Sequence, residues 1–251
     1  MEPVKIPNSN GQNLAAVIHR STTKTEKLAI LCPGYLDTKD YTHLIMLAED
    51  LANRGYTAVR FDPTGTWESD GDISEYLTSQ YLNDIENVLE YMLAEGNYTY
   101  VLLGGHSRGG QVSILYAARD PRISEVLGIM PSHAPVEGKR REDWESAGAS
   151  NSSRDIPGNT EERKSFSVPF THVLDRDQFD ALGDIEKIKV PIVLVSAEFD
   201  VSVPPEHVQE LFEHANESKK LIYLEGMDHE YRHNREEIEK VNALVMDALK
   251  A

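Results

Sequence analysis

Apolar and polar positions alternate along most of the chain in a regular pattern. Short, mostly apolar runs predict strands at residues 14–19, 28–32, 57–61, 100–104, 126–130, 191–196 and 220–224. Between them, apolar residues recur at spacings of three and four, which predicts helices at residues 41–54, 78–94, 111–119, 178–188, 205–215 and 236–249. Buried strands that alternate with amphipathic helices predict an α/β fold, with a mostly parallel sheet covered by helices on both faces.

The pattern fails between residue 132 and about residue 170. Residues 137–145 are strongly charged, and residues 147–160 are rich in Gly, Ser and Asn with little apolar content. A long unpatterned insertion in a compact domain is usually a disordered loop or a cover over an active site. This one follows the C-terminal end of a predicted strand, where α/β sheets bind ligands. We therefore predict one domain over residues 1–251, with a small cap or lid at about residues 132–175.

The main chemical motif is Gly-His-Ser-Arg-Gly at residues 105–109. It lies between a predicted strand and a predicted helix, and this context makes Ser107 the expected nucleophile of a strand-turn-helix elbow. Such a serine has a strained backbone, and a Cβ two residues before or after it would collide across the turn. Gly105 and Gly109 occupy those positions. The motif therefore predicts a nucleophile elbow in preference to an ordinary glycine-serine loop.

Two later segments can supply the base and the acid that a serine nucleophile needs. Asp200 follows the predicted strand 191–196, and His229 follows the predicted strand 220–224. The chain order Ser, Asp, His is the order of the α/β-hydrolase arrangement. Glu198 and His233 are close enough to compete for the same roles. We choose Asp200 and His229 because each falls at the C-terminal end of its strand, at the sheet edge of Ser107.

Acyl transfer also needs hydrogen-bond donors for the developing oxyanion. The residue after the nucleophile supplies one backbone N–H, which assigns this role to Arg108. The loop after an early strand should supply the second, and we expect the N–H of Tyr35, because the preceding Gly34 permits close approach. For the Arg108 side chain we expect a surface ion pair, with a contact to substrate as the alternative.

With these motifs in order, the sequence resembles the α/β-hydrolase superfamily. Within it, the sequence is similar to the small bacterial feruloyl or cinnamoyl esterases with a short cap. The motifs that carry the resemblance lie at residues 33–35, 60–62, 69–71, 105–110, 200–204 and 226–229. The resemblance implies the α/β-hydrolase fold and a Ser-His-Asp triad. Two departures are Pro33, where the family usually has His, and Gly-Thr-Trp-Glu at residues 65–68, where it has a Gly-His-Gly run.

A rival motif, His-Glu-x-x-His, occurs at residues 229–233. In zinc proteases this motif places two histidines one helical turn apart, with the Glu acting as base on metal-bound water. Here it begins three residues after Gly226, close behind a strand, and lacks the apolar face of a buried helix. We therefore interpret it as a chance match and expect no metal.

Composition narrows the function classes further. The formal net charge of −17 would repel a phosphate backbone, so we expect no nucleic-acid partner. The single cysteine, Cys32, excludes an intrachain disulfide and suits a buried apolar position. The start of the chain has no apolar signal-peptide core, and no apolar run approaches the length of a membrane span. We expect a cytoplasmic protein without a membrane partner.

The sequence thus predicts a cofactor-free serine carboxylesterase that acts on small-molecule esters through an acyl-enzyme. Aromatic-acid esters such as feruloyl or cinnamoyl esters are the class that the resemblance implies. Thioesterase, amidase or peptidase activity uses the same machinery and stays open, as does a non-catalytic binding protein of this fold. The sequence leaves the oligomeric state open, with a homodimer as one option.

Overall fold

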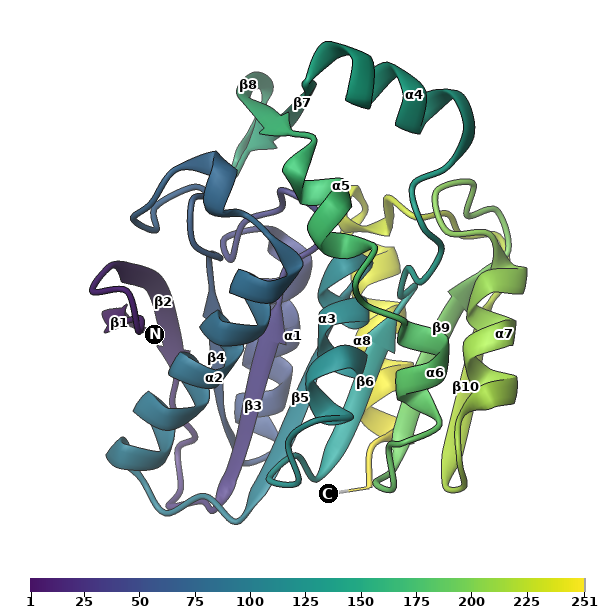
Figure 1. Ribbon diagram of the computed structural model, residues 1–251. Coiled ribbons are helices and arrows are strands. Elements are labelled where there is room, and N and C mark those ends of the chain that lie inside the picture. The colour runs from purple at the N-terminus through teal and green to yellow at the C-terminus, as the bar shows by residue number, and fades with distance from the viewer. Residues whose placement is uncertain (251) are drawn as a thin grey trace.

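A sheet of eight strands forms the centre of the protein (Figure 1). The computed structural model describes residues 1–250, so the last position of the domain predicted over residues 1–251 lies outside the described part. The strands are β1 (Glu2–Pro7), β2 (Asn13–His19), β3 (Lys27–Cys32), β4 (Tyr56–Phe61), β5 (Tyr100–His106), β6 (Glu125–Ile129), β9 (Ile192–Ala197) and β10 (Lys219–Leu224). Their order across the sheet is β1-β2-β4-β3-β5-β6-β9-β10.

Six neighbouring strands, from β4 to β10 in that order, are parallel, which confirms the predicted sheet. Their apolar runs are continuous because both faces are covered, and every residue of β4, β6 and β9 is buried. The strand β1, which pairs antiparallel with β2, was not predicted. Most of its residues are exposed or half-buried at the sheet edge and Ile6 alone among the six is buried, so it carries little apolar signal.

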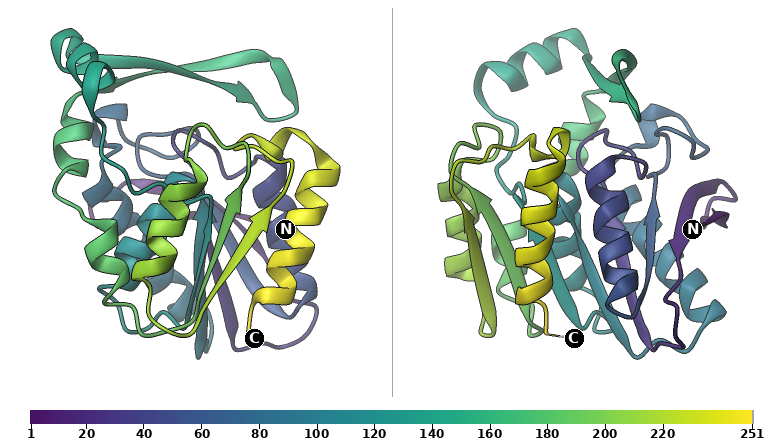
Figure 2. Two further views of the ribbon diagram at one scale, coloured as in Figure 1. Left: turned by 90° about the vertical axis from the view of Figure 1, so that its right-hand side faces the viewer. Right: turned by 180° about the vertical axis from the view of Figure 1, so that it is seen from behind.

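Helices cover both faces of the sheet, as predicted (Figures 1 and 2). One face carries α1 (Thr42–Asn53) and α8 (Arg235–Ala248). The other carries α2 (Thr78–Glu95), α3 (Arg108–Ala117), α6 (Ala181–Ile185) and α7 (Pro205–His214). The helix predicted at residues 178–188 is present but shorter, because Asp180 caps the start of α6 by accepting a hydrogen bond from the backbone N–H of Gly183 and the helix ends at Ile185. A further short helix, α5 (Thr171–Arg176), precedes it and was not predicted.

The segment without a sequence pattern contains regular elements. They are the helix α4 (Gly138–Ala147) and the antiparallel hairpin of β7 (Ala149–Ile156) and β8 (Asn159–Pro169). Both lie beyond the end of the sheet at which β5, β6 and β9 finish (Figures 1 and 2). Few apolar side chains of these elements are buried, among them Trp144, Phe166 and Val168. A hairpin exposed on much of its surface has no need of the apolar alternation by which strands are recognised.

Cys32 ends β3 and is fully buried, as the sequence predicted. Burial raises the pKa of its thiol to about 12, so the thiol is neutral and unreactive at ordinary pH. Among the described residues, no helix combines the length and the apolar character needed to cross a membrane.

Candidate active site

Ser107 stands at a sharp turn between β5 and α3. Its backbone has φ 55° and ψ −118°, a conformation that non-glycine residues rarely adopt. The Ser107 backbone N–H donates to the carbonyl oxygen of Ile129 at 2.8 Å, and its carbonyl accepts from the backbone N–H of Gln111 at 3.1 Å. These bonds tie the turn to β6 on one side and to α3 on the other. The strain predicted for a nucleophile elbow is therefore present at this serine.

The glycines on either side are required by close packing. A Cβ on Gly105 would lie 2.2 Å from the carbonyl oxygen of Cys32, and a Cβ on Gly109 would lie 2.0 Å from the same atom. Both distances are far below van der Waals contact, and the obstacle is backbone that cannot rotate away. The end of β3 therefore packs directly against the turn that holds Ser107.

Gly109→Ala is expected to destabilise the fold by about 3 kcal/mol or more, because the new methyl group forces β3 and the elbow apart. The control is Gly138→Ala, where the backbone has a positive φ, unlike that of Gly109, but nothing lies within 4 Å of the added Cβ. That substitution should cost about 1 kcal/mol from backbone strain alone. Urea unfolding measures both. Equal losses in the two variants would contradict the packing argument.

Asp200 and His229 are brought together at the ends of β9 and β10. His229 Nδ1 lies 2.7 Å from Asp200 Oδ2, and both residues are buried. Asp200 Oδ1 accepts hydrogen bonds from the backbone N–H groups of Ser202 at 2.9 Å and Val203 at 2.7 Å. The carboxylate is therefore fixed in one orientation, with its second oxygen directed at the imidazole.

The competing residues are engaged elsewhere. Glu198 is exposed, and its carboxylate accepts from the backbone N–H of Gly226. His233 is part of the 3-10 turn η2 (Tyr231–His233), where its side chain pairs with Glu230 at 3.3 Å. Because η2 is a single turn and His229 precedes it, the two histidines of the His-Glu-x-x-His motif do not share one face of an α-helix. The geometry that a zinc protease requires is not formed by these residues.

Ser107 and His229 line one cavity of about 450 Å³, which Tyr35 and Arg108 also line. Arg108 is the first residue of α3, so its backbone N–H has no partner within the helix. The Tyr35 turn is held by the Leu36 N–H, which donates to the Tyr76 hydroxyl at 3.2 Å, and Leu36 itself has φ 58°. Both backbone amides expected for an oxyanion hole thus belong to residues at this cavity.

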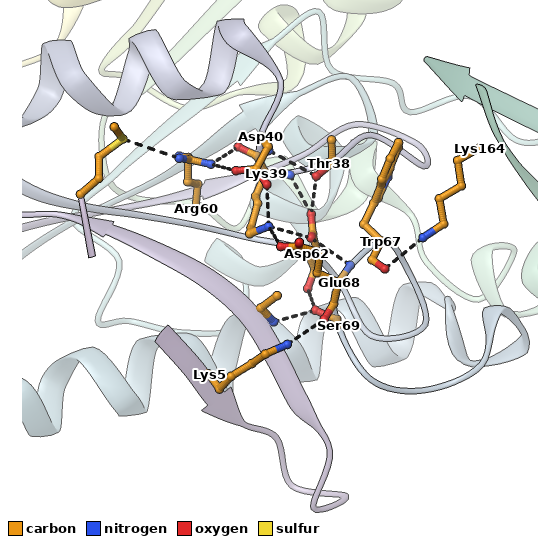
Figure 3. A network of polar contacts seen from close by, with 12 residues as sticks. Lys5, Thr38, Lys39, Asp40, Arg60, Asp62, Trp67, Glu68, Ser69 and Lys164 are labelled. Carbon is orange, nitrogen blue, oxygen red and sulfur yellow. Dashed lines mark hydrogen bonds and ion pairs between the residues drawn. The ribbon is translucent and has the colours of Figure 1, made fainter. Parts of the chain in front are cut away.

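A buried polar network supports the loop that carries Tyr35 (Figure 3). Asp62, which follows β4 and is fully buried, accepts from Thr38 Oγ1 at 2.9 Å and from the Lys39 backbone N–H at 2.8 Å. Lys39 Nζ lies 3.2 Å from Asp62 Oδ2 and 2.6 Å from Glu68 Oε2. Burial raises the pKa of Asp62 despite these donors. The network joins the loop after β3 to the loop after β4, so the two cannot move independently.

The loop after β4 is also held in place by a second buried carboxylate, that of Asp84 in α2. It accepts hydrogen bonds from the backbone N–H and the hydroxyl of Thr64, both at 2.8 Å, and from Gln80 Nε2 at 2.8 Å. Burial raises the pKa of Asp84 to about 6, although these donors oppose the shift.

Asp84 should make stability fall as pH rises. Between about pH 4 and pH 6 the folded protein retains a proton on Asp84 that the unfolded chain releases, so the free energy of unfolding drops across this interval, by about 3 kcal/mol in total. Asp84→Asn removes the titration while keeping the shape. The stability of the variant relative to the wild type should rise by that amount between pH 4 and pH 7 in urea unfolding. Parallel pH profiles for the two proteins would contradict the assignment.

The hairpin β7–β8 is attached to the site by its own charged residues. Arg154 donates through Nη2 to the carbonyl oxygen of Tyr35 at 2.7 Å, and its Nε lies 3.2 Å from Asp37 Oδ1. Asp155 pairs with Arg232 at 3.0 Å and accepts from the Tyr41 hydroxyl through its backbone carbonyl at 2.8 Å. The hairpin therefore contacts both the loop of Tyr35 and the segment that follows His229.

The Arg108 side chain differs from expectation, because the predicted surface ion pair is wrong. Its relative exposure is 2%, and no carboxylate lies within 4.0 Å of it in residues 1–250. Nη2 donates to Thr78 Oγ1 at 3.2 Å, and the guanidinium carbon lies 5.1 Å from the centre of the Tyr76 ring. The start of α2 packs over this side chain and removes it from solvent.

Asp37, His43 and His106 form a buried group that sequence reasoning missed. They place three potential metal-ligand atoms within 4.8 Å of one another. Burial lowers the pKa of both histidines, which keeps the rings neutral. The Arg154 guanidinium already neutralises Asp37 through Oδ1, Asp37 Oδ2 lies 3.8 Å from His106 Nδ1, and the His106 ring lies 4.6 Å from the His229 ring. This group therefore fits a support behind His229 better than a metal centre.

Other cavity residues escaped sequence reasoning because they lie in or beside the unpatterned segment. They are Arg140, Trp144, Arg154 and Arg176. A compositional signal existed, since five of the chain's 13 arginines fall within residues 132–176. Which of them face the cavity could not be read from spacing alone.

The family model described as serine aminopeptidase S33 matches residues 23–152, more than half of the chain. The mitochondrial palmitoyl-protein thioesterase ABHD10 of Mus musculus is 24% identical over 185 residues, which cover 70% of this chain and 59% of that protein. This chain thus spans less than two thirds of that relative's length. The polyketide transferase grgF of Penicillium sp is 25% identical over 244 residues, covering 80% of each chain.

Solved structures give the fold. Est1E from Butyrivibrio proteoclasticus with bound ferulic acid has a TM-score of 0.79 at 20% identity, covering 98% of each chain. The α/β hydrolase GrgF from Penicillium sp. sh18 has a TM-score of 0.83 at 19% identity, covering 98% of this chain and 96% of that one. These similarities confirm the predicted α/β-hydrolase fold. Together with the family match, they show that the chain belongs to the serine aminopeptidase S33 family of α/β hydrolases.

Proposed function

We propose that this protein is a serine hydrolase that cleaves small carboxylic esters. The observation that carries the proposal is the position of Ser107, on a strained elbow and in the same cavity as His229, which pairs with the buried Asp200. In the proposed roles Ser107 is the nucleophile, His229 the base and Asp200 the group that orients the base. The backbone amides of Tyr35 and Arg108 receive the oxyanion.

The His229–Asp200 contact decides which imidazole nitrogen can act as base. A carboxylate can only accept, so Nδ1 of His229 carries the proton that it donates to Asp200 Oδ2. Nε2 then holds the free lone pair and takes the proton of the Ser107 hydroxyl while Oγ bonds to the ester carbon. The carbonyl oxygen becomes an oxyanion held by the two amides. Collapse expels the alcohol, which takes the proton from Nε2 and leaves an acyl-enzyme.

Water completes the cycle by the reverse sequence. His229 Nε2 removes a proton from water as the hydroxide oxygen bonds to the acyl carbon, and the same two amides receive the second oxyanion. Collapse then breaks the bond to Ser107 Oγ, which recovers its proton from Nε2. The products are one carboxylic acid and one alcohol, and no cofactor enters the balance.

Thioester hydrolysis is the second candidate, because the relative ABHD10 is named a palmitoyl-protein thioesterase. The chemistry would be unchanged, but a palmitoyl chain requires a long apolar channel. The cavity that contains Ser107 is lined by four arginines, which are Arg108, Arg140, Arg154 and Arg176. Desolvating them against an alkyl chain is unfavourable, which disfavours a palmitoyl group and favours a short or polar acyl group.

The proposal is tested with a fluorophosphonate probe and a panel of activated esters. We expect covalent labelling at Ser107, located by peptide mass spectrometry, and hydrolysis of p-nitrophenyl acetate that EDTA does not change. Matched oxygen esters, thioesters and amides with the same acyl group then rank the bond type. Activity that chelation abolishes, together with no label at Ser107, would overturn the serine mechanism. A preference for palmitoyl thioesters would overturn the choice of small esters.

A further inference from the structure

The cavity at Ser107 carries charge of the opposite sign to the rest of the protein. The chain has a formal net charge of −17, yet this cavity is lined by four arginines and two acidic residues, Asp37 and Glu230. Both acids are already paired with arginine. Asp37 lies 3.2 Å from Arg154, and Glu230 lies 2.9 Å from Arg232. The positive charge of the remaining cavity arginines is therefore not cancelled by these carboxylates.

Those arginines are Arg108, Arg140 and Arg176, and no carboxylate within the described residues comes within 4.0 Å of their guanidinium nitrogens. Arg108 is the most enclosed of them. Its Nη2 donates to Thr78, while Nε and Nη1 are buried without any hydrogen-bond partner. A buried cation without an anion loses its hydration uncompensated, and buried N–H donors are rarely left unsatisfied.

Arg176 shows the same deficit. Its Nη2 donates to the carbonyl oxygen of Ala134 at 2.7 Å, but its Nε is buried without a partner. Burial, followed by the charges of Arg108 and Arg140, lowers the pKa of Arg176 to about 10, so the group stays charged at neutral pH. Burial and the charge of Arg108 likewise lower the pKa of His172 to about 2, which keeps that ring neutral. The positive charges of the three arginines thus repel one another around the same cavity.

The hydroxyl of Tyr35 adds another buried polar group at the same place, beside the side chain of Ser152. Its ring lies 6.0 Å from Tyr76, over which the Arg108 guanidinium sits. Donors that converge on one cavity from the elbow, from the loop after β3 and from α5 are complementary to an anionic group.

We propose that the physiological substrate is an ester that carries a second, free carboxylate, and that Arg108 and Arg176 bind this carboxylate while Ser107 attacks the ester. This inference rests on the proposed esterase function and names its substrate class. Arg140, which is exposed on α4, lies at the same cavity and adds attraction. The carboxylate can belong to the acyl part or to the alcohol part of the ester.

Two pairs of substrates separate these sources. In the first pair the acyl part carries the charge, and the mono-4-nitrophenyl ester of adipate is compared with its methyl-capped, neutral form. In the second pair the alcohol part carries it, and 4-acetoxybenzoate is compared with its methyl ester. Each kcat/KM is divided by the rate of hydroxide-catalysed hydrolysis of the same compound. This ratio removes differences in intrinsic reactivity.

The wild type should prefer the charged member of at least one pair by about 10-fold or more, and the favoured pair identifies the part that carries the carboxylate. Arg108→Gln and Arg176→Gln should each lower this preference by about 10-fold. The matched control is Arg163→Gln on the exposed part of β8, which removes the same charge outside the cavity and should leave the preference intact. Thermal unfolding of each variant verifies that it folds.

Equal corrected kcat/KM values of the wild type for the charged and neutral esters of both pairs would overturn the inference, while the esterase function would stand. A preference that neither Arg108→Gln nor Arg176→Gln reduces would also overturn it. If no ester is hydrolysed, the proposed function fails. The anion site is then tested separately, by measuring whether the protein binds a carboxylate. Calorimetry on Ser107→Ala should then detect adipate and not dimethyl adipate, and the added Arg108→Gln change should weaken adipate by about 10-fold. Equal binding of the two compounds would overturn the anion site itself.

Discussion

Ser107→Ala is expected to lower kcat for p-nitrophenyl acetate by about 10⁴- to 10⁶-fold, close to the level of a protein that merely binds the ester. The variant lacks the hydroxyl that would form the acyl-enzyme, so His229 keeps its contact with Asp200 but can activate only water. The backbone of the turn should persist, since alanine meets the same φ of 55° as serine and both glycines remain.

Stopped-flow or steady-state release of nitrophenolate measures the loss, and thermal unfolding should give a midpoint near that of the wild type. Labelling by a fluorophosphonate should disappear in the same variant. Retention of more than a tenth of the wild-type kcat would place the nucleophile elsewhere in the chain.

Asp200→Asn should lower kcat by about 10⁴-fold while leaving the fold in place. The reason lies in the loop after β9, where two backbone N–H groups, from Ser202 and Val203, point at Oδ1. An asparagine must keep its carbonyl oxygen toward these donors, so its NH₂ group is turned toward His229. That group donates to Nδ1, which forces the imidazole proton onto Nε2, and Nε2 can then no longer accept the proton of Ser107.

The matched control is Glu198→Gln, two residues earlier in the same loop. Its carboxylate is exposed and accepts from the Gly226 backbone N–H, which the amide oxygen of glutamine can replace. This variant should keep nearly full activity. If Glu198→Gln were the impaired variant and Asp200→Asn the active one, the assignment of the acid would be wrong. Proton NMR of the His229 ring in Asp200→Asn reports the tautomer directly.

The sequence was most informative where local backbone requirements and chemistry coincide. Gly105 and Gly109 could be interpreted as elbow glycines because their motif lies between a predicted strand and a predicted helix, and the atom that they approach, the Cys32 carbonyl oxygen, belongs to the neighbouring strand β3. The proposed acid and base could be placed because parallel strands end at one edge of the sheet, and Asp200 and His229 are found there in contact. The parallel strands themselves were visible because burial on both faces leaves a continuous apolar run.

The missed features depend on contacts between distant segments. The edge strand β1 and the hairpin β7–β8 are too exposed to leave a pattern of alternating polarity. The prediction for the Arg108 side chain was wrong because the start of α2 covers it. Its contacts, Thr78 and Tyr76, lie about 30 residues away in the chain and could not be inferred from local sequence. A cation next to a nucleophile looks the same in a sequence whether it faces solvent or a closed cavity.

The attachment of the β7–β8 hairpin limits how this protein could diverge or be rebuilt. Arg154 and Asp155 are adjacent residues of one strand, yet they reach the carbonyl of Tyr35 and the side chain of Arg232, which belong to two different loops of the core. A transplanted cap from another hydrolase would therefore remove supports from two loops of the core as well as the walls of the pocket. Chimeras that exchange the cap should keep these two residues, and recombination boundaries within β7 are less favourable than boundaries outside residues 132–176.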